Sequence, residues 1–180
     1  MKSRLSGLLL AAGLVVAPTV AMAQNPFHFN IAAGAAIPTG DLGDGANVGY
    51  NFTVGVGVRP ALSPLGFRVE GKYNNFGAKD CPANLSCDNL SLKGIDANVL
   101  YDFMPVTKTV GVSFYGIGGL GAFKASVSDV DSDTKLGWNI GAGLRIPLSG
   151  FSGYVEARFH QVQGNGGNVN WIPLTFGLVF

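Results

Sequence analysis

The last ten residues of the chain, Trp171 to Phe180, constrain its fold more than any other segment. Successive side chains of a β-strand point to opposite faces, so every second residue shares a face. One such face is entirely apolar here and consists of Ile172, Leu174, Phe176, Leu178 and Phe180. An edge strand with this face would aggregate in water, unless it closes a barrel whose outer surface contacts lipid. The segment therefore predicts a closing strand of a membrane-spanning β-barrel.

The beginning of the chain has the pattern of a secretory signal peptide. Two basic residues precede an apolar run, Leu5 to Val16, that is too short to cross a bilayer comfortably. Ala21-Met22-Ala23 then supplies the small residues of a cleavage site. An uncleaved membrane anchor is the alternative, but no polar stop pattern follows the run. We expect residues 1–23 to be removed and residues 24–180 to form one domain.

The composition of the chain favours a lipid environment over water. Charged residues make up 13% of the sequence and hydrophobic residues 47%, whereas about a quarter of the residues of a soluble domain are charged. The chain has 12 Lys and Arg against 11 Asp and Glu, so it offers no basic surface for nucleic acid. Beyond the signal, no apolar run reaches the roughly 20 residues of a transmembrane helix. A membrane chain without spanning helices must satisfy its backbone hydrogen bonds in a closed barrel.

Eight segments of alternating polarity follow the signal, each close to the length that crosses an outer membrane as a tilted strand. Their apolar faces carry no charged residue, as expected because a lysine or arginine there costs about 2–4 kcal/mol at mid-bilayer. The predicted lipid-facing sets are Phe27, Phe29, Ile31, Ala33, Ala35 and Ile37; Tyr50, Phe52, Val54, Val56 and Val58; Phe67, Val69, Gly71 and Tyr73; Ile95, Ala97, Val99, Tyr101 and Phe103; Tyr115, Ile117, Gly119, Gly121 and Phe123; Leu136, Trp138, Ile140, Ala142, Leu144 and Ile146; Val155, Ala157 and Phe159; and the terminal set.

Aromatic residues near the segment ends are predicted to form girdles at the membrane interfaces. They are Tyr50, Tyr73, Tyr101, Phe103, Trp138 and Trp171.

The connections between the segments alternate between short and long. Short turns are predicted at Pro60–Pro64, Met104–Thr109 and Pro147–Ser152, and longer polar loops at Pro38–Asn47, Ala78–Asn89, Lys124–Lys135 and Gly164–Asn170. Outer-membrane barrels have short periplasmic turns and long extracellular loops, so we expect both termini in the periplasm. The sequence thus predicts an all-β, eight-stranded antiparallel up-and-down transmembrane β-barrel.

The side chains on the opposite faces of the segments are polar, small or charged. This is the inverse of a soluble barrel, whose interior is apolar. The charged residues predicted to form a network in the lumen are Arg68, Glu70, Lys72, Asp96, Asp102, Arg145, Glu156 and Arg158. We expect two clusters: the strand of Arg68 to Lys72 with the strand of Asp96, and Arg145 with Glu156 and Arg158. The glycines predicted to make room for them are Gly55, Gly57, Gly116, Gly118, Gly141 and Gly143.

Four segments carry a resemblance to a known family: Ile37-Pro38-Thr39-Gly40-Asp41, Ile95 to Phe103, Phe114 to Gly121, and the C-terminal ten residues. The chain is similar to the small outer-membrane barrels that include the transmembrane domain of OmpA and the OmpX/Ail-like proteins. The resemblance implies a bacterial outer-membrane location, and an assembly signal in the terminal apolar set that the barrel assembly machinery recognises. It also implies a monomer that contacts outer-membrane lipid and lipopolysaccharide, with loops that are available to a surface ligand.

Cys81 and Cys87 lie close together in a predicted surface loop. An exported chain meets an oxidising compartment, so we expect a disulfide between them rather than two free thiols. Two cysteines without nearby histidines make a poor metal site. Asp129 to Asp133 resembles the start of a calcium-binding loop, but Thr134 replaces the required glycine, so we expect a solvated acidic loop.

Gly116 to Gly121 has the spacing of a dinucleotide-binding loop, but no helix pattern follows it. We therefore expect neither a metal nor a cofactor.

Catalysis is the remaining question. Val155 to His160 loosely resembles a segment of outer-membrane lipid A deacylases that ends in His-x-Ser-Asn, but Val162 stands at the matched serine position. A nucleophile must contact its base, so we expect His160 to be a lumen or rim residue. The sequence predicts a non-enzymatic barrel with a structural or surface-interaction role. The alternatives are a narrow channel for ions or small solutes and, less favoured, a lipid A-modifying enzyme.

Overall fold

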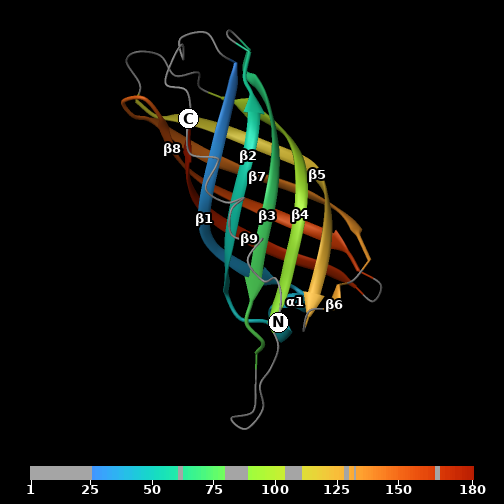
Figure 1. Ribbon diagram of the computed structural model, residues 1–180. Helices are drawn as coiled ribbons and strands as arrows, with labels where there is room; N and C mark the ends of the chain where they lie inside the picture. The colour runs from blue at the N-terminus through green and yellow to red at the C-terminus, as the bar shows by residue number, and fades with distance from the viewer. Residues whose placement is uncertain are drawn as a thin grey trace, which may run out of the picture.

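The structure is a computed structural model that describes residues 26–60, 63–79, 89–103, 111–127, 130–131, 133–164 and 167–180. Eight long strands dominate it. One short helix lies between the first two of them, and one two-residue strand lies between the fifth and the sixth (Figure 1). The long strands are β1 (Phe27–Thr39), β2 (Gly49–Val58), β3 (Leu65–Phe76), β4 (Leu90–Asp102), β5 (Ser113–Val127), β7 (Lys135–Pro147), β8 (Ser152–Gln163) and β9 (Asn168–Val179); the short elements are α1 (Asp41–Gly45) and β6 (Val130–Asp131).

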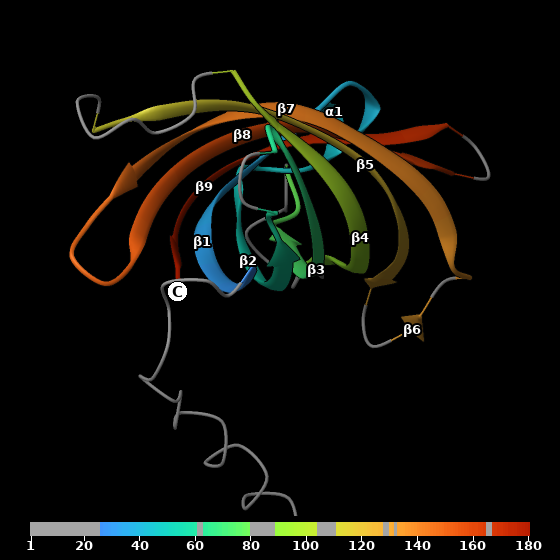
Figure 2. The same cartoon turned by 90° about the horizontal axis from the view of Figure 1, so that it is seen from above.

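The long strands form a closed antiparallel ring. The sheet order is β4-β3-β2-β1-β9-β8-β7-β5, and the pairing of β4 with β5 closes it. The first and last strands pair from Asn30 opposite Val179 to Thr39 opposite Asn170. Beyond this ladder, Phe29 and Phe180 exchange backbone hydrogen bonds of 3.0 and 2.8 Å. The prediction of an eight-stranded antiparallel up-and-down barrel is confirmed, and Figure 2 shows the strands curving around one interior.

The outside of the barrel is an apolar surface, as a lipid-facing wall requires. Phe29 is 65% exposed, Ile95 63% and Phe176 57%. The predicted alternation is found in every long strand except β5. The apolar face of the terminal segment, from Ile172 to Phe180, points outward, and the Phe180 ring packs 6.0 Å from the Phe151 ring.

The predicted orientation of β5 is wrong, because the face expected to contact lipid points into the lumen. Tyr115, Ile117 and Phe123 are buried in the lumen, whereas Phe114 and Leu120 face lipid at 49% and 72% exposure. Both faces of this strand are built from glycines and apolar residues, so polarity does not distinguish them. The predicted inward glycines Gly116 and Gly118 therefore lie on the outer face.

The two ends of the barrel differ: the loop end carries the predicted long loops, and the turn end carries the predicted short turns. At the loop end α1 follows β1, and an isolated bridge joins Ala46 to Ala78. β6 pairs with the end of β5 and extends that hairpin beyond the ring. Within the described ranges, no helix is long and apolar enough to cross a membrane.

Three predictions fall wholly outside the described residues. They are the signal peptide over residues 1–23, the disulfide between Cys81 and Cys87, and the short turn at Met104–Thr109, and all three stay predictions.

Candidate functional site: the charged lumen

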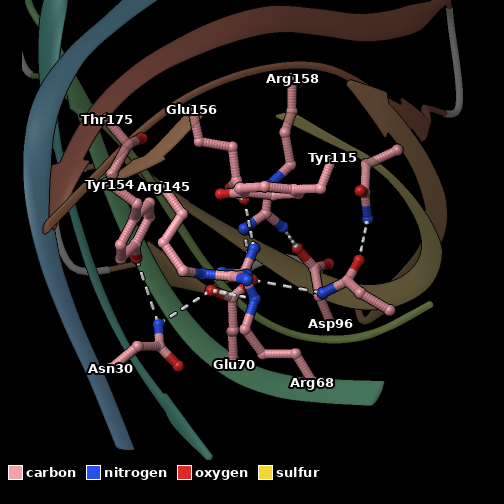
Figure 3. Close-up of polar contacts among 12 residues, drawn as sticks. Asn30, Arg68, Glu70, Asp96, Tyr115, Arg145, Tyr154, Glu156, Arg158 and Thr175 are labelled. Atoms are coloured by element: carbon pink, nitrogen blue, oxygen red, sulfur yellow. Dashed lines mark hydrogen bonds and ion pairs between the residues drawn. The ribbon is translucent and has the colours of Figure 1, made fainter. Parts of the chain in front are cut away.

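Four buried charged side chains from opposite walls of the barrel meet at the centre of the lumen (Figure 3). Arg68 and Glu70 come from β3, and Glu156 and Arg158 come from β8. Arg158 Nη2 donates to Glu70 Oε2 at 2.6 Å, and Arg68 Nη2 donates to Glu156 Oε2 at 2.5 Å. Arg68 Nε also lies 3.2 Å from Glu70 Oε1, and Arg158 Nε donates to Glu156. The guanidinium and carboxylate groups therefore alternate in sign across the barrel.

Two further charges extend this group toward the loop end. Lys72 Nζ lies 3.5 Å from Glu70 Oε2 and 3.7 Å from Asp96 Oδ2. Arg158 Nη1 lies 3.8 Å from the same Asp96 oxygen. The resulting charge cluster, which consists of Arg68, Glu70, Lys72, Asp96, Glu156 and Arg158, has three positive and three negative groups. Its formal charge is zero, as burial in a low-dielectric interior demands.

Neutral polar groups satisfy the remaining lone pairs of the two glutamates. Asn30 and Asn98 donate to the Glu70 carboxylate at 3.1 and 3.2 Å. The Tyr115 hydroxyl donates to Glu156 at 2.8 Å. Because charge-assisted hydrogen bonds are about twice as strong as neutral ones, these contacts fix the carboxylates in place. Asn139 supports the arrangement from β7 by donating to Asn98 at 2.9 Å.

A separate ion group occupies the turn end of the lumen. Arg59, just after β2, places Nη1 2.7 Å from Asp102 Oδ2, and Arg145 Nη1 lies 3.5 Å from Asp102 Oδ1. The Arg145 guanidinium also lies over the Tyr115 ring, 5.0 Å from its centroid. The expected grouping of Arg145 with Glu156 is wrong: Arg145 pairs in register with Tyr154, two residues closer to the turn end than Glu156. The expected separation of Glu156 and Arg158 from the cluster of β3 and β4 is wrong as well, because both residues belong to that cluster.

The loop end of the lumen is filled by apolar side chains. We call the buried group of Ala36, Ala46, Phe76, Leu92, Phe123, Val162 and Trp171 the apolar layer. The Phe123 ring packs edge-on against Trp171 with centroids 5.5 Å apart. It fits because Gly94 lies opposite, where an added Cβ would come within 2.3 Å of the Phe123 ring. Trp171 is fully buried, so its predicted place in an interfacial girdle is wrong.

His160 lies between the apolar layer and the charge cluster. Its ring stacks on Trp171 with centroids 4.8 Å apart, and its Nδ1 lies 4.0 Å from Asp96 Oδ2. In the described part of the chain, neither ring nitrogen forms a hydrogen bond. His160 therefore contacts no serine that it could activate there. The described residues also contain no group of three or more His, Cys, Asp or Glu side chains arranged to hold a metal.

The apolar layer is the part of the lumen that the sequence analysis missed. Its signal was present, because Phe76, Leu92 and Val162 fall on the inward positions of their segments, at the ends next to the long loops. Apolar residues on an otherwise polar face indicate a local change in what that face contacts. Here they contact one another across the mouth of the barrel.

The closed ring, the apolar belt and the charged interior define an integral membrane β-barrel. The model of one family, described as the outer membrane protein beta-barrel domain, matches residues 7–180. The chain belongs to this family, and it is a protein of the bacterial outer membrane. A comparison with curated proteins finds no match.

Several solved structures of bacterial outer-membrane proteins have a similar fold. Neisserial surface protein A has a TM-score of 0.67 and 21% identity, over 86% of this chain and 96% of its own. A major outer membrane protein of Thermus thermophilus has a TM-score of 0.51 and 16% identity, over 86% and 98%. Ail, the attachment invasion locus protein of Yersinia pestis, has a TM-score of 0.50 and 18% identity, over 87% and 99%. At these identities the likeness shows the fold alone.

Proposed function

We propose that this protein is a non-conducting, non-enzymatic outer-membrane barrel with a structural or surface-interaction role. The observation that carries the proposal is the filling of the lumen from wall to wall. Glu70 and Glu156 are 0% and 2% exposed, and Trp171 is 0% exposed in the apolar layer nearer the loops. A water column through the barrel would leave these side chains accessible. The barrel then serves as an anchor that presents its loops at the cell surface.

The geometry supports a plug rather than a narrow channel. The interior of an eight-stranded barrel is just wide enough for side chains to fill. An ion on its way through would have to separate Arg68 from Glu156 and Arg158 from Glu70, at 2.5 and 2.6 Å. Separating opposite charges in a low-dielectric interior costs free energy, because their attraction is only weakly screened there. The apolar layer adds a second barrier, because it offers a hydrated ion no polar partner.

The partners follow from this role. We propose a monomer that is folded by the barrel assembly machinery through its terminal apolar strand. Its belt contacts outer-membrane lipid and lipopolysaccharide, and its loops bind a surface ligand. Ail supports a surface role by analogy, since it is a barrel of similar fold that its description calls an attachment invasion locus protein.

Single-channel recording in planar bilayers tests the proposal. The unmodified protein should show no steady current. The neutral double substitution Arg68→Ala/Glu156→Ala removes one cation and one anion from the central cluster, so it should open a path at the turn side while the apolar layer still limits the current. Adding Phe123→Ala should raise the current further. A steady, large current from the unmodified protein that none of these changes alters would contradict the proposal and favour the channel.

A further inference from the structure

The outer wall of the barrel carries one apolar groove that ends in two lysines. The groove has a volume of about 590 Å³ and lies across β2, β3, β4 and β5. Its centre is a row of registered residues, Val54, Gly71, Ile95 and Ala122. Gly71 has no side chain and Ala122 has only a methyl group, so the wall is hollowed on either side of Ile95.

The next row toward the loops carries positive charge. In this row Tyr73 pairs in register with Lys93, and Lys93 pairs with Lys124. Both lysines are exposed and both line the groove. Among the described residues, neither forms an ion pair with a carboxylate. Two neighbouring ammonium groups repel each other, so a position between them favours an anion.

A third row beyond the lysines is polar and uncharged. The Asn75 amide donates to Ser91 Oγ at 2.9 Å, and the Tyr73 hydroxyl lies 3.2 Å from the same oxygen. Successive rows on one face of a strand lie about 7 Å apart, so one lipid molecule can contact all three. From the membrane toward the loops, the wall thus presents an apolar groove, a pair of cations and a strip of hydroxyl and amide groups.

We propose that this wall, with Lys93 and Lys124 at its centre, binds a phosphorylated glycolipid of the outer leaflet. Its acyl chains lie against Val54, Gly71, Ile95 and Ala122, and a phosphate on its sugar lies between the lysines. This is the chemistry of the lipid A part of lipopolysaccharide. The long loops mark this end of the barrel as the cell surface, so the lysines lie at the level of the outer-leaflet headgroups. The site rests on the proposed function, because it is one place where the proposed membrane anchor would contact a specific lipid.

Exposed lysines distinguish this groove from two other grooves on the belt. A groove of about 500 Å³ between β1, β8 and β9 is lined by Ile31, Val155 and Phe176, and none of its lining residues is charged. A groove of about 320 Å³ across β5, β7, β8 and β9 contains Ala142 and likewise has no charged lining residue. These grooves can accept acyl chains of any lipid, whereas the lysine groove selects a lipid with phosphate at its head.

Titration of lipid A into the folded protein in detergent tests the proposal. Native mass spectrometry gives the ratio of lipid-bound to free protein as the lipid concentration rises. Each lysine near an anionic lipid headgroup contributes about 1 kcal/mol, so Lys93→Ala/Lys124→Ala should weaken binding about thirtyfold. Lys93→Arg/Lys124→Arg should retain binding, and Lys79→Ala, which removes a loop lysine outside the groove, should leave it unchanged. Lipid A without its phosphates should bind all of these proteins equally and weakly.

A filling variant tests the apolar part of the site separately. Ala122→Phe occupies the groove and should weaken binding of both lipid forms, whereas Ala142→Phe, in a groove without lysines, should not. The heat-modifiable gel shift verifies that each variant is folded. Unchanged binding of phosphorylated lipid A after removal of both lysines would overturn the proposal, as would an equal loss for the dephosphorylated lipid. Neither lysine lines the lumen, so these results are independent of the conductance test.

Discussion

Replacing Glu70 with alanine removes the anion that has the most partners in the lumen. Its carboxylate accepts hydrogen bonds from Arg158 at 2.6 Å and from two asparagines, and it pairs with Arg68 and Lys72. Without it, three cations face two carboxylates in a site that excludes water. Removing one partner of a buried ion pair costs about 3–5 kcal/mol because the remaining charge is uncompensated. We expect the free energy of unfolding to fall by that amount.

Equilibrium unfolding in urea, with the folded protein in detergent micelles, measures this change. Glu70→Gln is the matched control for shape, because it retains the side-chain length and one acceptor oxygen while it removes the charge. Glu70→Gln/Lys72→Met restores a neutral cluster and should recover part of the loss, because it removes a cation that contacts both Glu70 and Asp96. A Glu70→Ala protein as stable as the unmodified one would refute the reasoning. So would a double variant no more stable than Glu70→Gln alone.

Three other predictions concern assembly, the apolar layer and topology. Deleting Phe180 should leave secreted but unfolded protein, because this residue continues the pairing that closes the ring; a full heat-modifiable gel shift after the deletion would contradict this. Phe123→Ala should lower the unfolding free energy by about 3–5 kcal/mol, and Phe114→Ala, on the lipid face of the same strand, should cost less in the same urea assay. Proteases added to intact cells should cut within residues 80–88 and spare the turn at Pro64; cleavage at that turn would invert the topology.

Wherever one face of a strand is polar and the other apolar, the sequence suffices to orient it. β3 is an example: Phe67 and Val69 alternate with Arg68 and Glu70, and the structure places the first two on the belt and the others in the lumen. The cost of a charge in lipid leaves only one orientation. The number of strands and the positions of the turns follow from the same alternation.

Other features depend on contacts between segments distant in the sequence, which the alternation does not contain. β5 turns Phe123 inward, where its ring occupies space that Gly94, on the neighbouring strand β4, leaves open. Arg145 is placed by the register between β7 and β8, which carries it past Glu156 to Asp102. These two outcomes depend on register and on side-chain volume. Trp171 differs, because the alternation itself places it inward, next to Ile172 and Leu174 on the lipid face.

The charge cluster also affects how fast the folded barrel unfolds. Its two shortest pairs between walls, Arg68 with Glu156 and Arg158 with Glu70, each join residues 88 positions apart. β3 and β4 together bring two cations and two anions, and β8 brings one of each, so each wall is neutral before the walls meet. The pairs between walls form only when the ring closes, and interactions that form after the transition state for folding slow unfolding rather than speed folding. We therefore expect these pairs to prolong the lifetime of the folded barrel rather than to speed its folding.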